Sequence, residues 1–161
     1  MSQQIKNRTL KILIWTFIPV VVIVALYLLF KPSDRNVAIL DEATLDVSEA
    51  FFRYEFENEK EAHVDTFYIE IQDKDPPRQL LARFKDYSKR VEKGSNAQDD
   101  GIRIVNGILF FIKSYKWYSD SSVVIHGGLY VGNVGLETGD YTLEKSLDKW
   151  IVVSYTPGVW G

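Results

Sequence analysis

The chain has 161 residues, of which 19 are basic, 22 are acidic and none is cysteine. The lack of cysteine excludes disulfides, thiolate metal sites, a cysteine nucleophile and lipidation on a thiol. Residues 31–161 hold 16 of the basic residues and all 22 acids, a net charge of −6. Binding of nucleic acid needs clustered positive charge, so this balance argues against a nucleic-acid partner.

Residues 12–30, ILIWTFIPVVVIVALYLLF, contain no charged side chain. As a helix the run would span ~28 Å, close to the ~30 Å hydrocarbon core of a bilayer. It is longer than the apolar part of a signal peptide, and it ends in Leu28-Leu29-Phe30-Lys31-Pro32 without small residues for cleavage. The sequence therefore predicts a transmembrane anchor at 12–30 that follows a short cytoplasmic tail, residues 1–11.

The charges that flank the run predict its orientation. Lys6, Arg8 and Lys11 precede it without any acid, whereas Lys31 and Arg35 follow it among acidic residues. Basic residues are retained in the cytoplasm. We therefore expect a single-pass protein of the cell membrane whose N-terminus is cytoplasmic and whose domain is extracytoplasmic.

The residues after the anchor read as a polar linker, 31–37, and one globular domain, 38–161. Residues 38–58 repeat apolar side chains at helical spacing, which predicts an amphipathic helix. Residues 66–72, TFYIEIQ, alternate apolar and polar side chains, which predicts a half-buried strand.

A second helix is predicted over residues 75–93. Asp75 can cap it, Pro76 and Pro77 are tolerated in a first turn, and Gly94 is a natural stop. The rest of the chain reads as strands, at residues 102–118, 122–132, 140–145 and 150–155. The last two would form a hairpin around Leu147-Asp148.

The order of these elements, α-β-α-β-β-β-β, and the closing hairpin YTLEKSLDKWIV from Tyr141 to Val152 resemble the cystatin-like fold of the nuclear-transport-factor-2-like superfamily. The resemblance covers roughly residues 40–155. It implies an α+β domain in which helices pack on a bent antiparallel sheet. The FRYEF and DPP segments are also similar to those of uncharacterised, membrane-anchored bacterial envelope proteins.

Only two histidines are present, and His63 lies in a charged loop. His126 lies within a predicted strand, and a cystatin-like pocket often uses a histidine with an acid or a tyrosine, so His126 is the catalytic candidate and Tyr115 and Tyr130 are pocket candidates. No aspartate can be named as its partner from the sequence. Two distant histidines argue against a metal site, and no cofactor motif is present, so no metal or cofactor is expected.

Three predicted strands have apolar side chains at both odd and even positions, and so on both faces of the sheet: residues 108–112, 123–125 and 150–153. An antiparallel sheet with one wet face should instead alternate. The second face then needs a cover, which a second copy, a partner protein or an apolar ligand could supply, unless the bent sheet wraps around its own core. The interface candidates are Ile108, Phe110, Ile112, Trp150 and Val152.

These features favour a membrane-anchored extracytoplasmic interaction domain that binds a protein partner or forms a homodimer. Such architecture is similar to that of assembly components of type IV secretion systems and of transporter-associated proteins. The alternative is a ligand-binding or catalytic cystatin-like domain with His126 in its pocket. An immunity or inhibitor protein that recognises a toxin would look the same in sequence.

Overall fold

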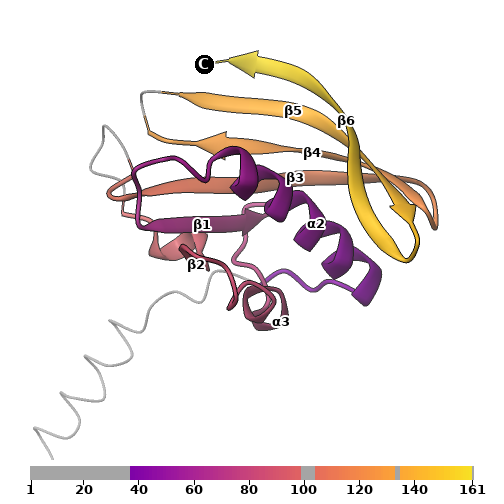
Figure 1. Cartoon of the computed structure of the whole chain (residues 1–161), viewed down its shortest axis with the longest axis horizontal. Helices are drawn as coiled ribbons and strands as arrows, with labels where there is room; N and C mark the ends of the chain where they lie inside the picture. Colours follow the sequence, from indigo (N-terminus) through magenta and orange to yellow (C-terminus); the bar gives the residue numbers. More distant parts are fainter. Residues whose placement is uncertain (1–36, 99–103, 133–134, 161) are drawn as a thin grey trace, which may run out of the picture. The chain divides into compact units, whose positions relative to one another are not determined.

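The computed structural model describes residues 37–98, 104–132 and 135–160. The anchor predicted at 12–30 lies outside these residues, as do the tail and most of the linker. No helix in the described ranges is long and apolar enough to cross a bilayer. The elements, drawn in Figure 1, are α2 (Glu42–Asn58), β1 (Thr66–Ile71), α3 (Arg78–Ala82), β2 (Arg90–Lys93), the 3-10 turn η1 (Gly94–Asn96), β3 (Gly107–Ser119), β4 (Ser122–Tyr130), β5 (Leu136–Ser146) and β6 (Lys149–Trp160).

The six strands form one mixed sheet in the order β2-β1-β3-β4-β5-β6. β1 runs parallel to both β2 and β3, whereas β3 to β6 pair antiparallel. The predicted antiparallel sheet is therefore wrong. The chain from residue 72 to 106 crosses back from the end of β1 to the start of β3, and such crossover connections make neighbouring strands parallel.

The second helix is also shorter than predicted. Only α3, five residues long, is helical, and the chain from Arg90 to Lys93 forms strand β2 instead. Asp75 does not cap α3, because its buried carboxylate accepts hydrogen bonds from the backbone N–H (2.9 Å) and the hydroxyl (2.7 Å) of Ser95. The expected α+β, cystatin-like domain is thus corrected to a mostly-sheet domain with one long helix.

The helix α2 lies across one face of the sheet (Figure 1). Asp41 caps its start by accepting a hydrogen bond of 2.8 Å from the backbone N–H of Thr44. Phe51, Phe52 and Phe56 on its inner side are fully buried. The ring of Phe56 lies 5.1 Å from that of Phe110 on β3. Burial of each such side chain contributes ~1.5–3 kcal/mol, so this face holds the core.

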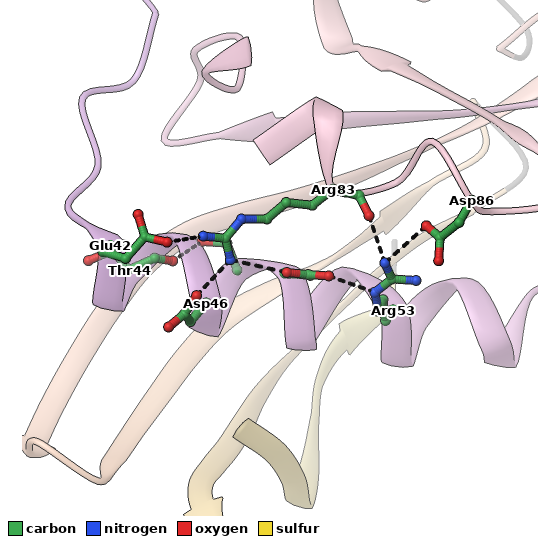
Figure 2. Close-up of polar contacts among 8 residues, drawn as sticks. Glu42, Thr44, Asp46, Arg53, Arg83 and Asp86 are labelled. Carbon is green, nitrogen blue, oxygen red and sulfur yellow. Dashed lines mark hydrogen bonds and ion pairs between the residues drawn. The ribbon is translucent and has the colours of Figure 1, made fainter. Parts of the chain in front are cut away.

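Two arginines connect α2 to the segment that follows α3 (Figure 2). The guanidinium of Arg83 contacts the carboxylates of Glu42, Asp46 (2.6 Å) and Glu49 (3.1 Å). Arg53 donates to the backbone carbonyl of Arg83 at 2.7 Å. Arg83, which lies in the predicted second helix, is therefore engaged in ion pairs within the domain.

Candidate functional site

The interface candidates lie on the face that α2 covers. Ile108, Phe110 and Ile112 are at most 3% exposed and belong to the core cluster. Trp150 and Val152 on β6 are partly buried and pack against the same cluster. Ile108, Phe110 and Ile112 are therefore covered by α2 and offer no docking surface. Trp150 also lines a cavity of about 430 Å³ beside α2.

The alternate side chains of β3 point to the opposite face of the sheet, away from α2, and line a shallow groove. Leu109 and Phe111 on β3 form its apolar floor together with Leu136 on β5. Its volume is about 310 Å³. Its remaining lining consists of polar and charged side chains: Glu70, Lys113, His126, Tyr130 and Thr138. We call this feature the outer-face groove.

A glycine at the centre of the sheet helps to form the outer-face groove. Gly128 on β4 pairs with Phe111 on one side and with Thr138 on the other, so no side chain of β4 stands between these two lining residues. A Cβ at Gly128 would lie 1.9 Å from the carbonyl oxygen of Glu137, which only glycine avoids. Close packing of β4 and β5 therefore requires this glycine and leaves the face hollow.

His126 has the carboxylate partner that the sequence could not identify. Its Nδ1 lies 2.9 Å from Oδ1 of Asp140, the residue opposite it on β5. Protonation of the imidazole turns this contact into an ion pair. The side chains are 45% and 58% exposed, so the pair is open to water at the rim of the outer-face groove.

Lys113 provides a second cation at this rim. Its ammonium group lies 5.2 Å from the ring centre of Phe111 and forms an ion pair with Asp73. The cation therefore lies above the apolar floor, a favourable position over an aromatic face.

The two pocket tyrosines lie on opposite faces of the sheet. Tyr130 lines the outer-face groove with His126. Tyr115 packs on the core side, where its hydroxyl hydrogen bonds to that of Ser48 at 2.7 Å. Burial raises the pKa of Tyr115 well above its ordinary value. A β-bulge between Ile112 and Ser114 shifts the alternation of side chains along β3, so that Tyr115 points to the core face. Tyr115 therefore cannot act with His126.

The geometry of the outer-face groove suits binding better than chemistry. The His126–Asp140 pair is the type of unit that moves protons, but catalytic sites exclude water around such a pair. Within the described ranges, no three histidine, aspartate or glutamate side chains are placed to hold a metal ion. An apolar floor with a charged rim is the usual composition of an interface centre.

A buried carboxyl group on the covered face was not predicted. Glu55 on α2 is 4% exposed and hydrogen bonds to the hydroxyl of Tyr141. The pKa of Glu55 is raised to about 7, chiefly by burial; the charges of Glu137 and Glu59 also raise it, whereas the hydrogen bond with Tyr141 lowers it. The hydroxyl of Tyr155 donates to Glu137 at 2.7 Å, which completes this polar cluster.

Signals for both missed acids are present in the sequence. Glu55 follows Phe51 by four residues, which places it on the buried side of the helix. The register that pairs Tyr130 with Leu136, beside Gly132 and Gly135, sets His126 opposite Asp140.

No family model, no curated protein and no solved structure matches the chain. The resemblance to the superfamily is therefore untested by these comparisons, and no function can be transferred to the outer-face groove from a relative.

Proposed function

We propose that the chain is a membrane-tethered, extracytoplasmic interaction domain that binds a partner protein through the outer-face groove. The observation that carries the proposal is the groove itself: an apolar floor of Leu109, Phe111 and Leu136 beneath a rim that includes Lys113 and His126.

The openness of the outer-face groove favours a protein over a small molecule. Small-molecule sites enclose most of the ligand surface, with volumes of about 300–1,000 Å³. This groove has about 310 Å³ and lies across an open sheet face, so it contacts a ligand from one side. A partner protein can insert one large apolar side chain there and place carboxylates near Lys113 and His126.

The membrane tether rests on the sequence. The uncharged run 12–30 has the length of a membrane span, and the basic flank of Lys6, Arg8 and Lys11 favours a cytoplasmic N-terminus. The net charge of −6 over residues 31–161 is compatible with a domain that remains soluble beside the membrane.

The test compares one variant inside the outer-face groove with one outside it. Leu136→Asp places a charge in the apolar floor, whereas Thr156→Asp places the same charge on an exposed residue of β6, outside the groove lining. Tagged full-length chains are recovered from detergent-solubilised membranes of the source cells with their bound proteins. Thermal unfolding of each chain shows whether the variant is folded.

We expect Leu136→Asp to reduce the yield of one specific partner about tenfold or more, while Thr156→Asp leaves it unchanged. Equal recovery of that partner by both folded variants would count against the outer-face groove as the binding surface.

The His126–Asp140 pair favours a second candidate, a catalytic function with the imidazole as acid or base. His126→Gln and Asp140→Asn separate the two possibilities, because they remove a catalytic acid or base completely but leave the apolar floor of the groove intact, so a binding domain should lose at most part of its partner recovery. A complete loss of biological function in His126→Gln, with partner recovery intact, would support the enzyme.

A further inference from the structure

Four polar side chains form a hydrogen-bonded chain on the face of the sheet that α2 covers. Glu55 on α2 hydrogen bonds to the hydroxyl of Tyr141 on β5, which in turn hydrogen bonds to the hydroxyl of Tyr155 on β6. Tyr155 also donates to Oε1 of Glu137 on β5 at 2.7 Å. These contacts connect the helix to both strands of the last hairpin. We call the four side chains the carboxyl–tyrosine chain.

Packing holds the two tyrosines in place. Their ring centres lie 4.6 Å apart, and the ring of Tyr141 lies 4.8 Å from that of Phe51. Across the sheet, Tyr141 pairs with the apolar Ile125 of β4. A Cβ at Gly139 would lie 2.2 Å from the ring of Tyr155, so the lack of a side chain there lets this ring lie against β5. The hydroxyl groups are therefore preorganised toward each other and toward the carboxyl groups.

The carboxyl–tyrosine chain has an acid at each end. Glu55 is 4% exposed and Tyr141 is 2% exposed, whereas Glu137 is half-buried. The charges that affect the pKa of Glu55 are those of Glu137 and Glu59, and both are negative. Tyr54, the other titratable neighbour on α2, contacts the ring of Tyr141. A buried carboxylate without a cation is costly, so Glu55, the more buried acid, favours the protonated form.

A count of protons shows what holds the carboxyl–tyrosine chain together. Three hydrogen bonds join its four side chains, and each needs one proton. Protonated Glu55 supplies one and the two hydroxyl groups supply the others, so each group donates to the next and the last acceptor is ionised Glu137. When Glu55 loses its proton to water, two protons remain for three contacts. Tyr141 then donates to the Glu55 carboxylate, and Tyr155 has one proton for both Tyr141 and Glu137.

The lost hydrogen bond and the new charge act at the same place. Deprotonation puts a second negative charge into the cluster, on α2, opposite the one that Glu137 carries on β5. Like charges in a buried cluster repel strongly, because little water screens them. Both effects weaken the packing of α2 against β5 and β6. The contact between Phe56 on α2 and Phe110 on β3 contains no titratable group and is unaffected.

We propose that the carboxyl–tyrosine chain is a proton-operated latch, which fastens α2 to β5 and β6 while Glu55 holds its proton and releases the two strands from the helix when that proton is lost. The latch lies on the covered face of the sheet. It therefore depends neither on the outer-face groove nor on the membrane tether.

A distance between the helix and the last strand tests the latch. The native chain has no cysteine, so Asn58→Cys and Thr156→Cys, both at exposed positions, accept a pair of spin labels in the full-length, detergent-solubilised chain. Double electron–electron resonance gives the distribution of distances between the labels from pH 5.5 to 8.5. Far-UV circular dichroism shows whether the chain is folded at each pH.

We expect one narrow distribution at pH 5.5 and an about twofold broader one at pH 8.5, because the released state adds conformers. The midpoint of the change should lie near pH 7. Glu55→Gln should stay narrow throughout, since its amide donates a hydrogen bond as the protonated acid does. Glu57→Gln, at an exposed acid of the same helix, is the matched control and should respond as the wild type does.

Glu137→Gln gives a readout that a merely structural role would not move. It removes a charge that raises the pKa of Glu55, so the midpoint should shift to lower pH. An unchanged midpoint would contradict the coupling of the two acids. A folded wild-type chain with the same distribution at every pH would overturn the inference. So would a pH response that persists in Glu55→Gln, because His63 or His126 would then cause it.

Discussion

At the scale of single residues, Glu55 is a carboxyl group in a buried environment, with its side chain 4% exposed. It lies on the inner side of α2, where burial raises its pKa and the charges of Glu137 and Glu59 raise it as well, against the hydrogen bond with Tyr141. The folded domain therefore retains a proton there up to about pH 7, whereas the unfolded chain loses it near the ordinary value of 4.5.

This difference predicts how stability depends on pH. Since the folded state binds more protons between pH 4.5 and 7, the contribution of Glu55 is greatest below pH 4.5 and decreases as the pH rises through 7. We expect the free energy of unfolding to fall by an amount on the order of 3 kcal/mol across this range. Urea unfolding of the detergent-solubilised chain between pH 5 and 8 measures it.

Glu55→Gln removes the titrating group and keeps the size of the side chain. The variant should be more stable than the wild type above pH 7, and its stability should vary less with pH. If wild type and Glu55→Gln show the same slope, another group causes the pH dependence.

A second residue, Asp75, connects segments that are distant in sequence. Its buried carboxylate accepts two hydrogen bonds from Ser95 and lies 3.5 Å from the ammonium group of Lys93. Asp75→Ala would leave these donors without their acceptor, so we expect a loss of about 3 kcal/mol in the free energy of unfolding. Asp65→Ala, at an exposed acid, is the control and should change stability little. Similar losses in both variants would contradict this role for Asp75.

At the scale of elements, the close pairing of β4 with β5 depends on Gly128. A Cβ there would lie 1.9 Å from a backbone oxygen of β5, and backbone cannot move away as easily as a flexible side chain. Gly128→Ala should therefore cost about 3 kcal/mol of stability. Gly135→Ala is the matched control, because its nearest neighbour, the Cγ2 of Val131, would lie 3.6 Å from the new Cβ. Thermal unfolding compares the two, and an unaffected Gly128→Ala chain would contradict this packing.

The same scale shows which elements local sequence could predict. The helix predicted over 38–58 is present as α2, and the turn at Leu147-Asp148 connects β5 to β6. These elements follow from local periodicity and turn position. The spacing of apolar residues over 75–93 also fits a helix, but in the structure Val91 pairs with Phe67 of β1, so a non-local ladder replaces the helix.

The candidate site was harder to predict for a related reason. Residues 108–112 carry apolar side chains on both faces of the sheet, and nothing in the local sequence indicates which face α2 covers. The predicted interface residues Ile108, Phe110 and Ile112 turned out to lie on the covered face. His126 was found by its chemistry, but Asp140 becomes its partner only through the register of β4 and β5. Register and face are properties of the sheet as a whole.

At the scale of the whole molecule, we propose one extracytoplasmic domain tethered to the membrane by the uncharged run 12–30. Full-length chains with a single cysteine test this orientation, since the native chain has none. Asn58→Cys should react with a membrane-impermeant maleimide in intact spheroplasts, because the domain is expected outside. Ser2→Cys should react only after permeabilisation, because the N-terminus is expected in the cytoplasm. The reverse pattern would show that the orientation is wrong.

The central claim is that the outer-face groove binds a protein partner, and photo-crosslinking in native membranes tests it most directly. A benzophenone amino acid replaces Lys113 at the rim of the groove in one full-length chain, and exposed Thr156 on β6, outside the groove lining, in another. Irradiation followed by mass spectrometry identifies what each position touches. The account predicts a discrete protein adduct from position 113 that is absent from position 156. No adduct from position 113, or the same adducts from both positions, would contradict it.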